Sequence, residues 1–103
     1  MSALFRFSDH TITNDAGRAV LAESEATILG LLAKYHNRVV SFERIAKSLW
    51  PISADEVKNE HNQIAIYVHH LRAKLVPFNL AVKNIHGVGY YLEGELDVDW
   101  TAI

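Results

Sequence analysis

Apolar residues recur at helical spacing most clearly over residues 59–75, NEHNQIAIYVHHLRAKL, which contain no Pro or Gly. Ile64, Val68, Leu71 and Leu75 fall at i, i+4, i+7 and i+11, so a helix places all four on one side. This pattern predicts the longest helix of the chain, with that side buried against the rest of the protein.

A second side of the same helix combines hydrogen-bonding side chains with an apolar one and has no carboxylate. It carries Gln63, Ile66, Tyr67, His70 and Lys74. An amide, a hydroxyl and an imidazole can bond to the edges of bases, and a branched alkyl group can contact the methyl group of thymine. The alternative is the ordinary solvated face of an amphipathic helix, which has the same composition without a ligand.

Shorter patterns precede this helix. Apolar and polar residues alternate over 3–7, 10–13 and 18–21, and turn-forming residues separate these stretches. They predict three short strands and therefore a small antiparallel sheet at the N-terminus. We expect this sheet to support the helices, because it shows no residue pattern typical of catalysis.

Two further helices are predicted between the sheet and the long helix. Ser24 is a suitable N-cap for a helix that continues to about Tyr35, and Ser41 for a short helix over 42–49. Pro51 follows the second helix and ends it, because proline cannot continue the hydrogen-bond ladder.

The last apolar pattern predicts a β-hairpin. Strands are expected over 80–85 and 90–93, joined by the glycine-rich turn at 86–89. Three strands, three helices and a hairpin make an α+β fold, and two helices followed by a hairpin is the layout of a winged helix-turn-helix. We therefore expect a winged helix-turn-helix domain over 1–93 and an acidic C-terminal tail over 94–103, which either docks on the domain or stays loose.

Composition limits the class of protein. The chain has 103 residues, of which 50% are hydrophobic and 21% charged, which is typical of one globular domain. It has no cysteine, no signal peptide pattern and no apolar run near the ~18 residues that span a membrane, so we expect a cytoplasmic protein. Nucleophile-elbow, P-loop and zinc-protease motifs are absent, so we expect no enzyme, no cofactor and no metal site.

Charge is unevenly distributed along the chain. The net charge is −2, but residues 58–90 contain four basic residues and one acidic residue, whereas 91–103 contain four acidic residues and no basic one. The positive segment also contains four of the six histidines, namely His61, His69, His70 and His86. Unperturbed histidine gains charge as the pH falls through ~6.5, which gives the hypothesis of tighter binding to a polyanion at acidic pH.

Three segments resemble the DNA-binding effector domain of OmpR/PhoB-type response regulators, which serve two-component systems. They are SEATILGLL from Ser24, VVSFERIAKSLW ending at Trp50, and VHHLRAKL from Val68 followed by IHGVGYYL from Ile85. The resemblance extends from about Phe5 to Leu92. It implies a bacterial transcription regulator that binds double-stranded DNA, with the helix over 59–75 in the major groove and the hairpin as a wing on the adjacent groove. No receiver domain is present in these 103 residues.

The resemblance and the helix pattern together assign the DNA contacts. Expected base contacts are Gln63, Ile66, Tyr67, His70 and, on the wing, His86. Expected contacts with the DNA backbone are Trp50, Asn62, His69, Arg72, Lys74 and Tyr90. For Trp50 the alternative is packing at a helix end, and for Arg72 it is pairing with an acidic neighbour. The family also implies two copies on repeated half-sites and contact with RNA polymerase through the loop over 51–57, unless that loop is only a connector.

The chain departs from the family where the family usually has arginine. His69, His70 and His86 stand at these positions. Arginine forms two hydrogen bonds with guanine, which neutral histidine cannot match. Each lost cation also removes roughly one unit from the salt dependence of DNA binding. The departures allow weak affinity, a different DNA site or binding that strengthens on acidification. They also motivate an alternative function, a winged-helix module for protein–protein interaction that has lost DNA binding.

Overall fold

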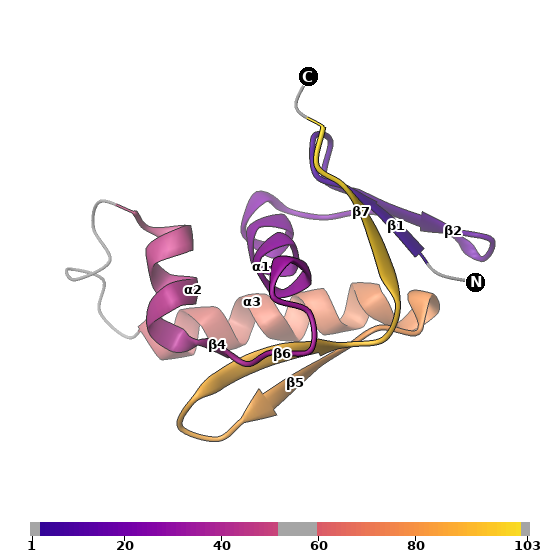
Figure 1. The fold of residues 1–103 in the computed structure, drawn as a ribbon. Helices are drawn as coiled ribbons and strands as arrows, with labels where there is room; N and C mark the ends of the chain where they lie inside the picture. Colours follow the sequence, from indigo (N-terminus) through magenta and orange to yellow (C-terminus); the bar gives the residue numbers. More distant parts are fainter. Residues whose placement is uncertain (1–2, 52–59, 102–103) are drawn as a thin grey trace.

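The computed structural model describes residues 3–51 and 60–101. It is an α+β fold in which three helices pack together between a four-stranded and a three-stranded sheet (Figure 1). The elements are β1 (Ala3–Arg6), β2 (Thr11–Asn14), β3 (Gly17–Val20), α1 (Glu23–Lys34), β4 (Val40–Ser41), α2 (Phe42–Leu49), α3 (Glu60–Leu75), the 3-10 turn η2 (Val76–Phe78), β5 (Ala81–Ile85), β6 (Gly89–Glu93) and β7 (Leu96–Asp99). The predicted order of strands, helices and hairpin is confirmed.

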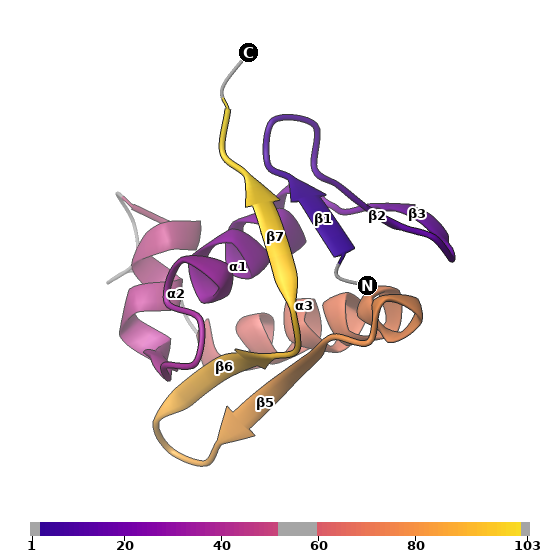
Figure 2. The same cartoon turned by 45° about the vertical axis from the view of Figure 1, so that its right-hand side comes forward.

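The N-terminal sheet has the strand order β3-β2-β1-β7 and is antiparallel only in part. β1, β2 and β3 pair antiparallel as predicted, whereas β7 joins in parallel, with Leu96–Asp99 opposite Ala3–Arg6. Figure 2 shows β7 running beside β1. Beyond β7, the rings of Trp100 and Phe7 lie 5.6 Å apart between centroids. Residues of the acidic tail therefore dock on the domain and supply the fourth strand of its sheet.

The turn between β1 and β2 is fixed by a short polar contact. The Thr11 hydroxyl donates a hydrogen bond of 2.6 Å to the carboxylate of Asp9, and this bond lowers the pKa of Asp9. The contact is local and lies at the far end of the sheet from the wing. We therefore assign it a role in the turn only.

The two short helices begin in different ways. The predicted N-cap at Ser24 is wrong, because α1 begins at Glu23 with Ala22 as its N-cap, two residues earlier than predicted. The carboxylate of Glu25 accepts a hydrogen bond of 2.9 Å from the backbone N–H of Ala22, which is half of a capping box. The predicted cap of α2 is confirmed, since the Ser41 hydroxyl accepts a hydrogen bond of 3.2 Å from the Arg44 N–H.

The predicted buried side of α3 is confirmed. Its four apolar side chains have 0% exposure, namely Ile64, Val68, Leu71 and Leu75. This side packs against α1 and α2, so the position of α3 is set by the core. The predicted first residue, Asn59, and all of the 51–57 loop except Pro51 lie outside the described residues. Among the described helices, none has the length and apolar content to cross a membrane.

The second sheet has the strand order β4-β6-β5, and β5 and β6 form the predicted hairpin. Residues 86–88 make its turn, in which Gly87 has a φ of 75°, a backbone conformation that favours glycine. Gly89 is required for another reason, because a Cβ there would collide with the backbone carbonyl of Val40 in β4. The close approach of β4 thus anchors the wing to the helices.

Candidate nucleic-acid interface

The side of α3 opposite its buried stripe is open to solvent. Asn62, Ile66, His69 and His70 are all exposed, with Ile66 at 54%. Helical spacing places these residues together with Ala73 on one side, because the buried residues take the other. We call Asn62, Ile66, His69, His70 and Ala73 the outward face of α3. The side of α3 predicted from the sequence to contact bases is centred on Tyr67, which lies beside this outward face and not on it.

The outward face has an unusual chemistry for a helix surface. It offers one amide, one exposed branched alkyl group and two imidazoles, and the rings of His69 and His70 lie 5.8 Å apart between centroids. None of its five side chains is a carboxylate, an ammonium or a guanidinium. In the residues that the structure describes, no cluster of three or more histidines and acids forms a metal site. This face can therefore offer hydrogen bonds and apolar contact, with little fixed charge.

Lys74 lies on the flank of α3 that faces the start of α1. Its ammonium forms an ion pair of 2.7 Å with the carboxylate of Glu25 and a hydrogen bond of 3.3 Å with the backbone carbonyl of Val20. The side chain of Glu25 is 6% exposed, so the pair lies at the edge of the core. We do not include the predicted DNA backbone contact at Lys74 in the proposed interface, because leaving this site would strand a buried carboxylate.

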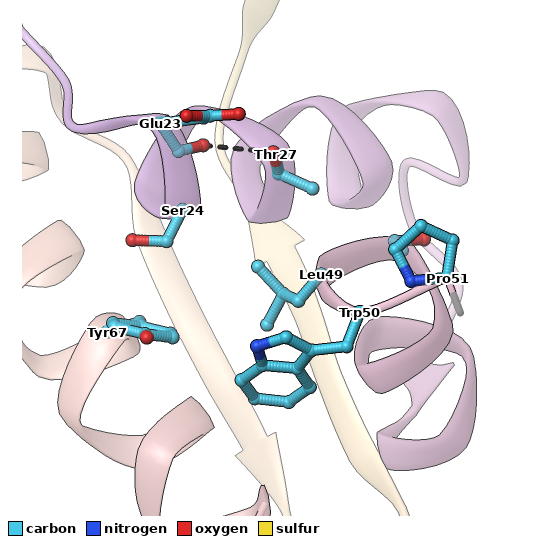
Figure 3. A pocket seen from close by; sticks show the side chains of 8 residues that line it. Glu23, Ser24, Thr27, Leu49, Trp50, Pro51 and Tyr67 are labelled. Carbon is cyan, nitrogen blue, oxygen red and sulfur yellow. Dashed lines mark hydrogen bonds between the residues drawn. The ribbon is translucent and has the colours of Figure 1, made fainter. Parts of the chain in front are cut away.

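Tyr67 and Gln63 occupy the same flank and are half-buried. The Tyr67 ring lies 6.5 Å from the ring of Trp50 between centroids, and Trp50 is also half-buried. Figure 3 shows both side chains beside an open pocket of about 570 Å³ between the start of α1 and the end of α2. Trp50 therefore packs at the end of α2, and its contact with the DNA backbone stays a prediction.

The other flank of α3 is tied to the wing. The Arg72 Nε donates a hydrogen bond of 2.8 Å to the backbone carbonyl of Val82, at the open edge of β5. At the start of the helix, the ring of His61 lies 4.3 Å from that of Phe42, which in turn packs edge-on against Tyr90. Arg72 therefore connects α3 to the hairpin through a backbone carbonyl. Among the described residues it forms no salt bridge with an acidic side chain.

Tyr90 does not fit the predicted contact with the DNA backbone. Its side chain is 5% exposed and packs in the core beside Phe42, with 5.6 Å between ring centroids. The family motif supplied this prediction, and the motif does not separate a core tyrosine from a surface one. We therefore remove Tyr90 from the candidate contacts.

The turn of the wing is exposed and largely apolar. His86 lies at its tip, and Ile85 and Val88 are 38% and 50% exposed. The Val88 N–H closes the turn on the Ile85 carbonyl at 2.9 Å. Figure 1 shows the hairpin extending beyond the helices, so its tip is free to contact a partner that α3 also touches.

A group of cations that sequence reasoning missed gathers around Tyr35. Arg44 and Lys34 lie 4.9 and 5.9 Å from the centre of its ring. The Tyr35 group consists of Lys34 and Arg44, and Arg38 and Lys47 are two further exposed cations of the same segment. Within the described part of the chain the ion pair is Lys74–Glu25, so none of these four is in a salt bridge. A sum over the first 57 residues hid them, whereas a window over 34–47 contains four basic residues and one acidic residue.

Comparisons with known proteins agree with each other. Residues 17–92 match the family described as "Transcriptional regulatory protein, C terminal". Response regulator protein PmrA of Pseudomonas aeruginosa is 33% identical over 84 residues, which cover 82% of this chain and 36% of the relative. Response regulator ArlR of Staphylococcus epidermidis is 30% identical over 83 residues, which cover 79% of this chain and 36% of the relative. The chain thus spans a minor part of the length of these curated relatives.

Solved structures give the same result. The C-terminal domain of the nisin resistance regulator NsrR is 26% identical with a TM-score of 0.69, and the match covers 84% of this chain and 88% of that one. The DNA-binding domain of Bacillus subtilis CssR is 25% identical with a TM-score of 0.68, covering 81% and 90%. The DNA-binding domain of E. coli CadC has a TM-score of 0.71, covering 84% and 81%, but at 16% identity it shows the fold alone.

Proposed function

Since the chain belongs to the family of C-terminal DNA-binding domains of response-regulator transcription factors, we propose that it binds double-stranded DNA through the outward face of α3. In this arrangement α3 lies in the major groove, which is wide enough for one helix. The β5–β6 wing reaches the adjacent groove with His86 at its tip.

The observation that carries this proposal is the exposure of the outward face on a helix whose other sides are fixed. α3 is held by its buried stripe, by the Lys74–Glu25 pair and by the Arg72 bond to the wing. Asn62, His69 and His70 remain exposed. A rigid helix with open hydrogen-bonding groups is what reading base edges requires.

Contacts with phosphate follow from the flanks. Arg72 uses Nε for the wing, so its two terminal nitrogens are available for a phosphate. The indole N–H of Trp50 and the side chain of Gln63 are proposed at the other border of the groove. We retain His69 as a contact with the DNA backbone and His70 as a base contact.

The wider setting is also proposed. The family relatives are longer than this chain, and we propose that the domain acts in the cytoplasm as the output of a two-component system. Two copies would bind adjacent half-sites. Contact with RNA polymerase through the 51–57 loop is proposed from the family resemblance alone.

An anisotropy titration of the 103-residue chain against a random duplex at low salt tests the proposal. Non-specific binders have dissociation constants of roughly 10⁻⁴ to 10⁻⁶ M at physiological salt and bind more tightly at low salt. We expect saturable binding that weakens as salt rises. Asn62→Asp, which keeps the side-chain shape and adds a negative charge, should weaken binding about tenfold. Absence of binding at about 30 µM would instead favour the protein-interaction module.

A further inference from the structure

The outward face of α3 lacks the side chains that recognise guanine. Guanine is most often read by arginine or lysine through its O6 and N7 atoms. The two cations of the described part of α3 lie on its flanks and not on this face, where the Nε of Arg72 is bonded to Val82 of the wing and Lys74 is paired with Glu25 of α1. The reading surface therefore has no cationic fork to place on a G·C pair.

What the face does offer fits adenine and thymine. Ile66 lies at the middle of this face and is 54% exposed. Its branched alkyl group can contact the C5-methyl group of thymine in the major groove. Asn62 presents a carboxamide, which pairs with the N6 and N7 atoms of adenine. The imidazoles of His69 and His70 can each form single hydrogen bonds, which discriminate less than a bidentate contact.

The spacing of these two residues suits neighbouring base pairs. Asn62 and Ile66 are four residues apart, which is about 6 Å along a helix axis at 1.5 Å per residue. Successive bases on one strand are about 3.4 Å apart, so this interval covers roughly two base-pair steps. Both side chains also lie in the same row of the helix surface. One helix can thus engage an adenine and a thymine close together.

On the basis of the proposed function, we infer that this domain selects half-sites with an A·T-rich centre, in which Ile66 contacts a thymine methyl group and Asn62 an adenine edge. The preference comes from the apolar and amide groups of the outward face of α3, which carries no arginine or lysine. Affinity for phosphate comes from other groups, among them Arg72 and His69, and does not depend on the base sequence.

Selection from a randomised duplex library with the 103-residue chain tests the inference first. We expect the bound sequences to be enriched in A·T at the centre of each half-site. Each selected thymine is then replaced by uracil, which removes only the methyl group. Loss of one buried methyl contact should weaken binding about fourfold at the position that Ile66 contacts. Uracil outside the half-site serves as the control and should change nothing.

The variant Ile66→Ala tests whether Ile66 is the residue that contacts the thymine methyl group. Ile66→Ala removes the alkyl contact from an exposed position, so its fold should be intact, as thermal melting would verify. The variant should bind thymine and uracil duplexes equally. Asn62→Ala should relax the selection for adenine while leaving the uracil effect in place.

Three outcomes would overturn the inference. Selection of a G·C-rich centre would do so, as would equal uracil sensitivity in the wild type and Ile66→Ala, or no uracil effect at any position. In each of these cases the domain still binds duplex DNA, so the proposed function survives. Failure to bind any duplex would overturn both.

Discussion

Two sides of the same helix carry polar residues and differ in what the fold does with them. On the flank of α3 beside α1, Lys74 and Tyr67 have partners from distant parts of the chain, Glu25 and Trp50. On the outward face no such partner is found among residues 3–51 and 60–101, and the ring contact there is between His69 and His70 themselves. The binding surface is therefore marked by side chains that are free to contact a ligand, more than by polar side chains as such. Whether a side chain is free depends on what packs beside the helix.

The largest effect on stability is expected from breaking the Lys74–Glu25 ion pair on the flank of α3 beside α1. Lys74→Met leaves the Glu25 carboxylate, 6% exposed, without its cation. Removing one partner of a buried pair costs several kcal/mol, and partial exposure of the Lys74 side chain reduces this to about 2 kcal/mol. For a domain of this size the Tm should fall by about 10 °C. Calorimetric or circular-dichroism melting measures the change.

The matched control is Lys34→Met, which removes an exposed cation from the Tyr35 group and should change the stability by less than about 0.5 kcal/mol. Below its melting temperature, Lys74→Met should bind DNA within twofold of the wild type. A tenfold loss of affinity with an unchanged Tm would assign Lys74 to the DNA contacts and contradict the distinction between the two sides.

The second largest effect is expected on DNA affinity, from a change on the outward face of α3. Ile66→Glu places a carboxylate at the middle of the outward face, where it would meet phosphates and base acceptors. We expect DNA affinity to fall about tenfold or more with little change in Tm, because the position is exposed. Val20→Glu, at an exposed apolar position of β3, is the control and should retain binding. Equal affinities for Ile66→Glu and the wild type would exclude this face from the interface.

The smallest effect concerns the spacing between helix and wing. Arg72→Lys keeps the positive charge but loses the bond from Nε to the Val82 carbonyl. Stability should fall by about 0.5 to 1 kcal/mol, with nearly the same salt dependence of DNA binding. Arg72→Gln should reduce the salt dependence by roughly one unit. A Lys variant as stable as the wild type would show that the bond to β5 contributes nothing.

What could be predicted from the sequence was local. The buried stripe of α3 follows from helical spacing, the cap at Ser41 from one residue type, and the turn at Gly87 from glycine in a hairpin. Each depends on residues close in the chain. These features were enough to place the winged helix-turn-helix.

What could not be predicted from the sequence depends on residues far apart. Lys74 is held by Glu25, which is 49 positions away, and no pattern within α3 reveals this partner. β7 has only four residues, and its pairing with β1 joins opposite ends of the chain. Tyr90 points into the core because β4 crosses beside β6, which is a tertiary contact. Such features require coordinates, because the two contacting residues lie far apart in the sequence and neither one indicates the other.

The most direct test of the central claim follows side-chain resonances of α3 by nuclear magnetic resonance as duplex DNA is added to the isotope-labelled domain. We expect large shifts or broadening at the Asn62 amide group and at the imidazoles of His69 and His70, with the Lys74 ammonium and the Tyr67 ring nearly unchanged. Perturbation concentrated on Lys74 and Tyr67, or on the N-terminal sheet, would contradict the account.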